Sequence, residues 1–411
     1  MNIHYSRFEN LIICTLIIMM MLAPTSYMMI KLAMIILLIA ANVVKNRFRI
    51  KASKKVFYPI FLLIVAEGSW SILNAIIKDS LTTQAIINVF PFNVLWPFVY
   101  LGMIPFLNGN GRSRQCLNLL VVSHVVIVLY NLYEIISLIY GFPILHVDEA
   151  SDTFRFDDSF FGIATNSMHN LVFTTPFFFV AGFSGKINRR FFYFFAALTV
   201  SVNIMTSRTM LVLVNFMSIG MVFFLSYRFL DIDRKKLISF TICVTALALL
   251  LLFCKVDSVY INSSVDYYLS HFDPSEDIRF EQREVLFGKW LDAPLTGIGS
   301  GTKVWTAARG WTNGFESTYH SKLANNGIIG VGIFFLYIML ITKNLYSRAR
   351  QEGNVLFLAS LAGLLSFLVG AYSNPLIGTF DRLFPIYLCL ACLYIREDSS
   401  AYKISNNGWK R

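Results

Sequence analysis

Charged residues one helical turn apart mark residues 276–330 as the part of the chain best equipped for chemistry. Arg279 and Arg283 are four residues apart, so on a helix their like charges share one face and repel each other unless an anion lies between them. A diphosphate is an anion of the right kind, since guanidinium groups bind phosphate oxygens through paired hydrogen bonds. The structural alternative is that Glu276, three residues before Arg279, pairs with it on a solvated helix face.

Glu316 and His320 form a second pair at this spacing, at the start of an apolar run. On a helix these two side chains share a face, which Gly327 continues. A carboxylate or an imidazole in such a position can take a proton from a hydroxyl group. The structural alternative is an ordinary polar helix start that caps the run.

Two further arginines lie in polar segments between apolar runs. Ser207 and Arg208 stand in a very short turn, which holds the guanidinium at the end of two apolar runs. The alternative for Arg208 is a side chain that extends toward lipid headgroups. Arg155 is followed by Asp157 and Asp158, which could neutralise it without any ligand.

The composition decides which kind of element must position these residues. Of the 411 residues, 56% are hydrophobic and 14% are charged, against about 25% charged residues in a typical soluble domain. The surface of a soluble protein of this size needs far more polar residues. The composition therefore excludes a soluble globular enzyme and predicts an all-α polytopic membrane protein.

Apolar runs bounded by charge clusters predict about twelve transmembrane helices with one long periplasmic loop between spans 9 and 10. The spans are expected near residues 8–24, 27–44, 56–77, 84–107, 117–140, 167–184, 191–206, 209–227, 237–255, 320–342, 355–372 and 383–395. They divide the chain into an N-terminal bundle (1–142), a central bundle with an outer loop at 143–166 (143–256), the large outer loop (257–319), a C-terminal bundle (320–395) and a tail (396–411).

The lysines and arginines give the expected orientation. Most of them fall in the loops from even to odd spans and near both termini, which places this side and both termini in the cytoplasm. The net charge of +11 is then a signal of topology rather than of nucleic-acid binding. The first apolar run is expected to be retained, because no clean signal-peptide cleavage site follows it.

Cysteines and isolated intramembrane charges suggest no cofactor. Cys389 and Cys392 form a C-x-x-C inside an apolar span without histidine or acidic partners, which favours a structural pair over a metal or redox site. We expect no metal and no cofactor. Lys31, Glu67 and Glu134 also fall within spans, where charges are functional suspects, but the sequence does not show what pairs with them.

The long outer loop, about residues 257–318, contains Trp290, Trp305 and Trp311 together with many glycines and tyrosines. This composition suits stacking on sugars or packing on a membrane surface. Tryptophan and tyrosine also gather at any membrane interface, which is the structural alternative.

The order of these features resembles the superfamily of bacterial O-antigen polymerases and O-antigen ligases, over roughly residues 150–345. The features are an outer arginine followed by a glycine and an asparagine, a Ser-Arg turn, an arginine about fifteen residues before Pro-Leu-x-Gly-x-Gly, and a polar helix start that leads into Gly-Ile-Ile-Gly. The matching residues are Arg155, Gly162, Asn166, Ser207, Arg208, Arg279, Pro294, Gly297, Gly299, Gly327 and Gly330.

This resemblance implies an inverting, metal-independent glycosyl transfer on the periplasmic face of the bacterial inner membrane. The implied donor and acceptor are undecaprenyl-diphosphate-linked oligosaccharides, with a chain-length regulator protein as a possible partner and no nucleic acid. Arg208 and Arg279 would neutralise the leaving diphosphate, with Arg155 and Arg283 behind them. Glu316 or His320 would be the base for the acceptor hydroxyl.

One departure from the ligase pattern favours a Wzy-type polymerase. Ligases typically have a histidine eleven residues before the first glycine of Gly-x-x-Gly, and this chain has Glu316 there, followed by Ser317. The alternatives are an O-antigen ligase that transfers the glycan to lipid A core, a flippase for lipid-linked oligosaccharides, or a membrane receptor or assembly factor without chemistry. Transporters usually show repeated halves and intramembrane charges, and no repeat is evident in this chain.

Overall fold

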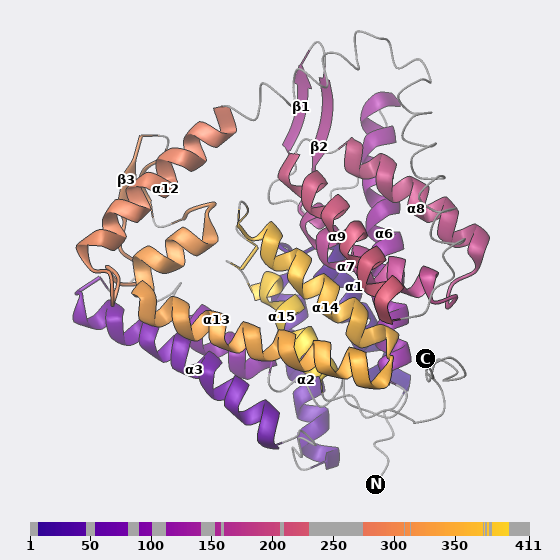
Figure 1. The fold of residues 1–411 in the computed structure, drawn as a ribbon, viewed down its shortest axis with the longest axis horizontal. Coiled ribbons are helices and arrows are strands. Elements are labelled where there is room, and N and C mark those ends of the chain that lie inside the picture. The colour runs from indigo at the N-terminus through magenta and orange to yellow at the C-terminus, as the bar shows by residue number, and fades with distance from the viewer. Residues whose placement is uncertain are drawn as a thin grey trace.

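The computed structural model describes residues 7–46, 54–80, 90–100, 112–140, 153–157, 160–205, 209–229, 274–307, 309–312, 314–372, 374, 376–377 and 380–393. These residues are mostly helical, with two short β-hairpins (Figure 1). The expectation of a helical membrane protein is therefore correct in its main feature.

The described helices lie where the apolar runs predicted them, apart from α12, which lies in the expected large outer loop. They are α1 Arg7–Leu22, α2 Met28–Asn46, α3 Lys54–Ile77, α6 Arg112–Tyr140, α7 Ser167–Phe183, α8 Arg189–Ile204, α9 Thr209–Phe229, α12 Pro274–Asp292, α13 Thr318–Glu352, α14 Val355–Gly370 and α15 Phe380–Cys392. The fourth expected span contains a π-helix, Pro91–Leu95, and the ninth lies outside the described residues. The strands are β1 Thr153–Asp157, β2 Phe160–Ala164, β3 Val304–Thr306 and β4 Gly310–Thr312.

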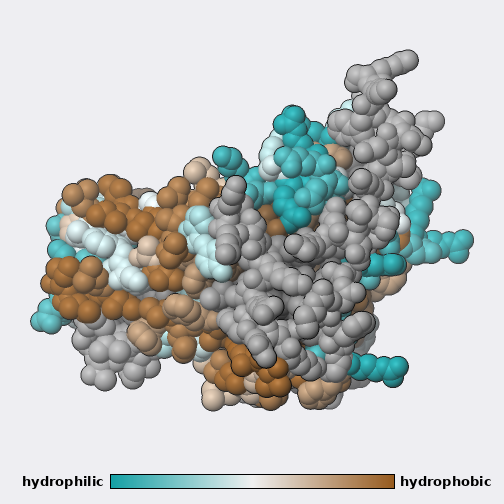
Figure 2. Space-filling model, turned by 90° about the horizontal axis from the view of Figure 1, so that it is seen from below, coloured by the Kyte–Doolittle hydropathy of each residue, from teal (hydrophilic) through white to brown (hydrophobic). Residues whose placement is uncertain are grey.

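Four of the described helices are long and apolar enough to cross a membrane: Phe57–Ile77, Arg114–Ser137, Met210–Phe229 and Thr318–Glu352. Several carry large apolar side chains on their outer faces, such as Leu62 on α3, Met217 on α9 and Met339 on α13. Figure 2 shows apolar side chains over much of the arm formed by α3 and α13. Such faces are stable in lipid, where exposed hydrocarbon has no water to order. The count of twelve spans stays a prediction.

The core of the bundle forms around α7, which packs against α6, α9 and α14. Gly363 on α14 lies so close to α7 that a Cβ there would be 3.0 Å from the carbonyl oxygen of Phe173, an arrangement typical of small residues between membrane helices. One polar side chain inside this core ties two helices together. Asn170 on α7 donates to the carbonyls of Met20 (3.0 Å) and Met21 (2.9 Å), which satisfies the end of α1.

Two of the three charges that the sequence left without partners, Lys31 and Glu67, form ion pairs across long separations in the chain. Lys31 on α2 is buried and its Nζ lies 3.0 Å from Oδ2 of Asp381, at the start of α15. Glu67 on α3 pairs with Lys322 on α13 and accepts a 3.0 Å hydrogen bond from the hydroxyl of Tyr337. Glu134 is buried on α6. Burying an ion costs several kcal/mol unless a partner compensates for it, so these pairs fix α2 to α15 and α3 to α13.

A glycine-rich turn after α12 inserts into a break in α13. At Gly327 the backbone of α13 is not helical, with φ of 63° and ψ of −170°. The turn supplies the hydrogen-bond partners that this break would otherwise lack. The amides of Ile328 and Ile329 donate to the carbonyls of Pro294 (3.0 Å) and Leu295 (3.2 Å).

Backbone amides of the same turn also donate hydrogen bonds to carbonyls of α13 just before the break. The amides of Ile298 and Gly299 bond to the carbonyls of Ala324 (2.8 Å) and Asn325 (3.0 Å). Gly297 and Gly299 both have positive φ, and a Cβ on Gly297 would lie 2.5 Å from the Asn325 carbonyl. Glycine is required here for close backbone approach, so this motif joins two segments of the chain rather than forming a cradle for phosphate.

Side chains of helix α3 bond to both the turn and the break in α13. Asn74 donates to the carbonyls of Thr296 (2.7 Å) and Asn325 (2.8 Å), and the indole of Trp70 donates to the carbonyl of Asn326 (2.9 Å). Side-chain amides that bridge two backbone segments restrict both of them. The end of α12 and the first turns of α13 are therefore held as one unit.

We predict that Gly327→Ala destabilises the folded chain by about 3 kcal/mol or more, because alanine strains this φ/ψ region and its Cβ overlaps the Leu295 carbonyl. Gly332→Ala is the matched control, since it lies on the same helix with no atom within 4 Å of the added Cβ. The thermal unfolding midpoint of the purified protein in detergent, and its yield in the membrane fraction, measure the effect. Equal midpoints and yields for the two variants would contradict this account of the break.

Candidate anion-binding and acid–base site

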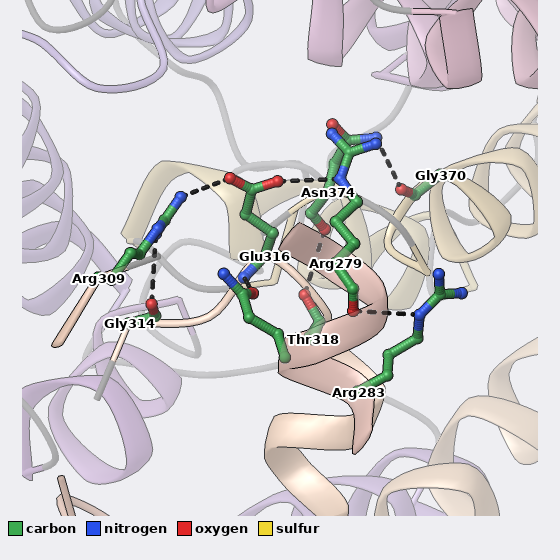
Figure 3. A network of polar contacts seen from close by, with 9 residues as sticks. Arg279, Arg283, Arg309, Gly314, Glu316, Thr318, Gly370 and Asn374 are labelled. Carbon is green, nitrogen blue, oxygen red and sulfur yellow. Dashed lines mark hydrogen bonds and ion pairs between the residues drawn. The ribbon is translucent and has the colours of Figure 1, made fainter. Parts of the chain in front are cut away.

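Arg279 and Glu316 meet where α12 crosses the start of α13. The Nε of Arg279 donates to Oε2 of Glu316 at 2.9 Å, and Glu316 lies just before the first residue of α13 (Figure 3). The backbone amide of Glu316 donates to Oε1 of Gln282, on the next turn of α12, at 3.1 Å. Arg279 thus pairs with a residue 37 positions further along the chain. The side chain of Glu276, its partner in the structural alternative, lies outside the described residues.

A second arginine, Arg309, also contacts the carboxylate of Glu316. Arg309, in the turn between β3 and β4, donates from Nη2 to Oε1 of Glu316 and from Nη1 to the carbonyl of Gly314 (Figure 3). The side chains of Arg279 and Glu316 are 20% and 28% exposed, and that of Arg309 is 42% exposed. Two cations therefore share one carboxylate in a place that a ligand can reach.

Arg283 and His320 lie on either side of Tyr372, which follows α14. The Nη1 of Arg283 donates to the Tyr372 hydroxyl at 3.3 Å, and the His320 ring centroid lies 6.0 Å from that of Tyr372. Arg283 also donates from Nε to the Arg279 carbonyl at 3.2 Å, which fixes it on the same side of α12 (Figure 3). Arg279, Arg283, Glu316 and His320 are thus brought into one cluster. Their spacing predicted two separate pairs on helix faces, and for Glu316 this was wrong, because it precedes the N-cap Ser317 and lies outside α13.

Ser317 uses its side chain to hold the imidazole of His320. Its hydroxyl lies 2.7 Å from Nδ1 of His320, and it makes no side-chain hydrogen bond to the amides of the first turn of α13, although Ser317 stands at the helix N-cap. A serine in this position usually stabilises its helix by about 1 kcal/mol through such a bond. The hydroxyl instead fixes the ring orientation. In the tautomer whose Nδ1–H donates to Ser317, Nε2 is the nitrogen that can accept a proton.

A small hydrophobic cluster joins α12, β3 and the first turns of α13. Leu286 on α12, Val304 on β3 and Ala324 on α13 are buried against Phe315. Thr318 donates to the carbonyl of Asn374 at 3.2 Å, which ties the start of α13 to the segment after α14 (Figure 3). The charged side chains are therefore presented by packed elements.

The other two predicted arginines are not placed in this cluster. Arg208 lies outside the described residues. Arg155 lies in β1 opposite Gly162 in β2, with its backbone described but not its side chain. Asn166, another residue of the resemblance, is at the N-cap of α7, and its side chain bonds to Thr25 at 3.2 Å and to the buried Arg382 at 3.4 Å.

Sequence reasoning missed Arg309, Tyr372, Gln282 and the role of Ser317 in this site. Arg309 stands between two tryptophans in a turn and has no charged residue at helical spacing to mark it. Tyr372 follows another helix, so only the packing of that helix brings it near. Ser317 is next to Glu316, and its position three residues before His320 was the one available signal.

Comparison with protein families locates this cluster in a known domain. Residues 193–335 match the O-antigen ligase family. The resemblance to the O-antigen polymerase and ligase superfamily is thereby confirmed over this part of the chain. A search of curated proteins found no match.

The O-antigen ligase match runs from α8 through the first half of α13. It therefore includes Arg279, Arg283, Arg309, Glu316 and His320, but not Tyr372. It indicates a membrane enzyme of the polymerase or ligase type that acts on lipid-linked oligosaccharides. The cluster is the part of that domain best suited to hold an anion beside an acid–base group. Among the described residues, no group of three potential metal ligands occurs.

We predict that inorganic pyrophosphate stabilises the purified protein against thermal unfolding, because a second anion relieves the repulsion among arginines that share one carboxylate. Arg279→Ala and Arg283→Ala should each weaken this effect about tenfold or more, consistent with the loss of a charge-assisted contact. The effect should also fall as the salt concentration rises. Lys289→Ala is the control, since Lys289 pairs with Asp292 near the other end of α12. The same stabilisation in all four proteins would refute an anion site here.

Proposed function

We propose that this protein polymerises polyprenyl-diphosphate-linked oligosaccharide repeat units into O-antigen or a similar surface polysaccharide. The reaction would take place on the periplasmic face of the inner membrane, by metal-independent inverting glycosyl transfer, in a bundle of about twelve spans. The observation that carries this proposal is the meeting of Arg279 and Arg283 with His320 and Glu316 in the O-antigen ligase domain.

In this reaction the bond between the anomeric carbon and the diphosphate oxygen breaks, and a bond to the acceptor hydroxyl oxygen forms on the opposite face of the sugar. The electron pair of the broken bond stays on the diphosphate, whose negative charge grows in the transition state. Arg279 and Arg283 would stabilise this charge through rigid, doubly donating guanidinium groups. Arg208 and Arg155 are proposed as further contacts to the same diphosphate.

The acceptor hydroxyl must lose its proton as the new bond forms. Either Glu316 or His320 could take it, and the contacts favour His320. Both oxygens of Glu316 already accept hydrogen bonds from guanidinium groups, so they are engaged by Arg279 and Arg309 instead of an acceptor hydroxyl. His320 is oriented through Nδ1 by Ser317 and presents Nε2 for the proton. Glu316 would then position Arg279 and Arg309.

The position of Glu316 also supports a polymerase over a ligase. The ligase pattern has a histidine at this place in the sequence, whereas here the residue holds two arginines. The alternative function, transfer of the finished glycan to lipid A core, uses the same donor chemistry. A flippase is the alternative from another class, and it would not need a base beside the arginines.

The decisive experiment compares the length ladder of cell-surface polysaccharide in a strain that lacks the gene with the same strain carrying variants. Deletion should leave single repeat units on a complete lipid core. The wild-type chain should restore the ladder, whereas Arg279→Ala and Arg208→Ala should reduce polymerisation by about 100-fold or more, the cost of removing a group that stabilises transition-state charge. Loss of even the single repeat unit on deletion would replace the polymerase with a ligase or a flippase.

Lys289→Ala provides the matched control for the ladder, because it removes a cation from the same helix without touching the cluster. Every variant must be present in the membrane at the wild-type level. A ladder that is normal with Arg279→Ala and Arg208→Ala would refute the roles assigned to both arginines.

A second pair of variants separates the two possible bases. His320→Ala should lower the rate of polymerisation in membranes by about 100-fold or more. The wild-type protein should lose activity on acidification, because the imidazole of His320 becomes protonated and can no longer accept a proton. Glu316→Gln should weaken pyrophosphate binding together with the rate, since it releases two arginines. A greater loss of rate in Glu316→Gln than in His320→Ala, with pyrophosphate binding unchanged, would make Glu316 the base.

A further inference from the structure

The hairpin of β3 and β4 carries two exposed tryptophans directly opposite each other. Trp305 pairs with Trp311 across the antiparallel strands, and their exposed fractions are 54% and 70%. Opposed residues of an antiparallel pair lie on one face, with Cβ atoms about 5 Å apart. Together the two indoles form an aromatic platform, which here means the outward faces of Trp305 and Trp311.

The opposite face of the hairpin fixes the orientation of this platform. Val304 and Thr306, on either side of Trp305, are buried, and Val304 packs in the cluster with Leu286 and Phe315. The backbone amide of Ala307 donates to the carboxylate of Glu281 on α12. A hairpin anchored in this way holds its outward side chains in place with little loss of entropy on binding.

The platform is linked directly to the arginine cluster. Arg309, in the turn of the hairpin, contacts Glu316, and Trp311 follows Arg309 by two residues. The Cα atoms of Arg309 and Trp311 are therefore within about 7 Å of each other. A substrate whose reacting end lies at the arginines would extend over or beside the two indoles.

The surroundings of the platform suit a sugar better than hydrocarbon. The exposed Lys303 stands two residues before Trp305, and each indole carries an N–H donor. A pyranose ring has an apolar C–H face, which packs on the negative face of an aromatic ring, and a rim of hydroxyl groups that need hydrogen-bond partners. By contrast, Phe280, Phe287 and Leu291 form an exposed stripe on α12 whose side chains carry no polar atom, as lipid favours.

We propose that Trp305 and Trp311 are a binding site for the oligosaccharide chain, which stacks on the indoles while its reacting end lies at Arg279 and Arg283. This inference rests on the proposed function, because it takes the glycan as the substrate. The platform holds sugar residues away from the reacting bond, so it strengthens the binding of longer glycans more than that of a single sugar. Without the two indoles, the polysaccharide products become shorter while glycosyl transfer itself continues.

Saturation-transfer NMR on the full-length protein in lipid nanodiscs tests the binding directly. The probe is the carrier-free oligosaccharide repeat unit, released by mild acid from the lipid-linked pool of the source strain. Trp305→Leu with Trp311→Leu should weaken binding about tenfold, whereas Trp305→Phe with Trp311→Phe should keep most of it, because phenylalanine retains an aromatic face. Phe287→Leu is the control on the neighbouring apolar stripe and should bind as the wild type does.

Two results would overturn the inference. If the double leucine variant binds the oligosaccharide and produces the ladder as the wild type does, the indoles serve only as apolar surface, as in a membrane anchor. If the wild-type protein shows no saturation transfer to the oligosaccharide, the platform does not bind this glycan. Shorter ladders from the double leucine variant at normal membrane levels support the inference.

Arg279→Ala separates a failure of this inference from a failure of the proposed function. The probe has no diphosphate, so this variant should bind it normally while losing the ladder. Suppose that Arg279→Ala loses the ladder, while the double leucine variant binds the oligosaccharide normally and makes a normal ladder. The proposed function then stands, and the platform is refuted as a glycan site. If instead Arg279→Ala makes a normal ladder while binding of the oligosaccharide depends on the tryptophans, the catalytic role of Arg279 is refuted and the glycan site stands.

Discussion

The exchange of backbone hydrogen bonds between the turn at residues 293–301 and the break in α13 at Gly327 is the interaction on which the site depends. A break in a membrane helix exposes amides and carbonyls that lipid cannot satisfy. The glycine-rich turn satisfies them because its own backbone comes close enough, which only residues without a Cβ allow. Helix α12 precedes this turn, and Glu316 and His320 precede the break. Their relative positions therefore follow from one joint, which Asn74 and Trp70 on α3 reinforce.

Charge is distributed unevenly around this joint. Glu316 contacts both Arg279 and Arg309, and Arg283 lies on the same side of α12. Half-exposed ion pairs contribute little to stability, about 1 kcal/mol or less each, so stability alone does not account for the arrangement. The arrangement suits the anion site proposed above, since the guanidinium groups are held in place before a ligand arrives. Ser317 fits the same view, because its hydroxyl orients His320 instead of capping α13.

The buried ion pairs deeper in the bundle have a different role. Lys31 and Asp381 belong to helices near opposite ends of the chain, and Glu67 meets Lys322 only because α3 packs along α13. Such pairs give little net stability, yet removing one partner leaves an uncompensated charge in the membrane at a cost of about 3–5 kcal/mol. They thus specify which helices are neighbours. Lys322 lies between His320 and the break, so the Glu67 pair also fixes the segment that carries the imidazole.

The sequence by itself determined the membrane class, the position of nearly every described helix, and the closeness of Arg279 to Arg283 on one helix, because hydropathy and helical spacing are local properties. Only the tertiary structure decided that Arg279 pairs with Glu316, that Arg309 and Tyr372 join the site, and that the glycine motif is a joint. Apart from the contact of Arg309 with Glu316, these contacts connect residues 26 to 89 positions apart, and no local pattern encodes which helices become neighbours. That choice depends on how apolar faces and buried charges pair across the whole bundle.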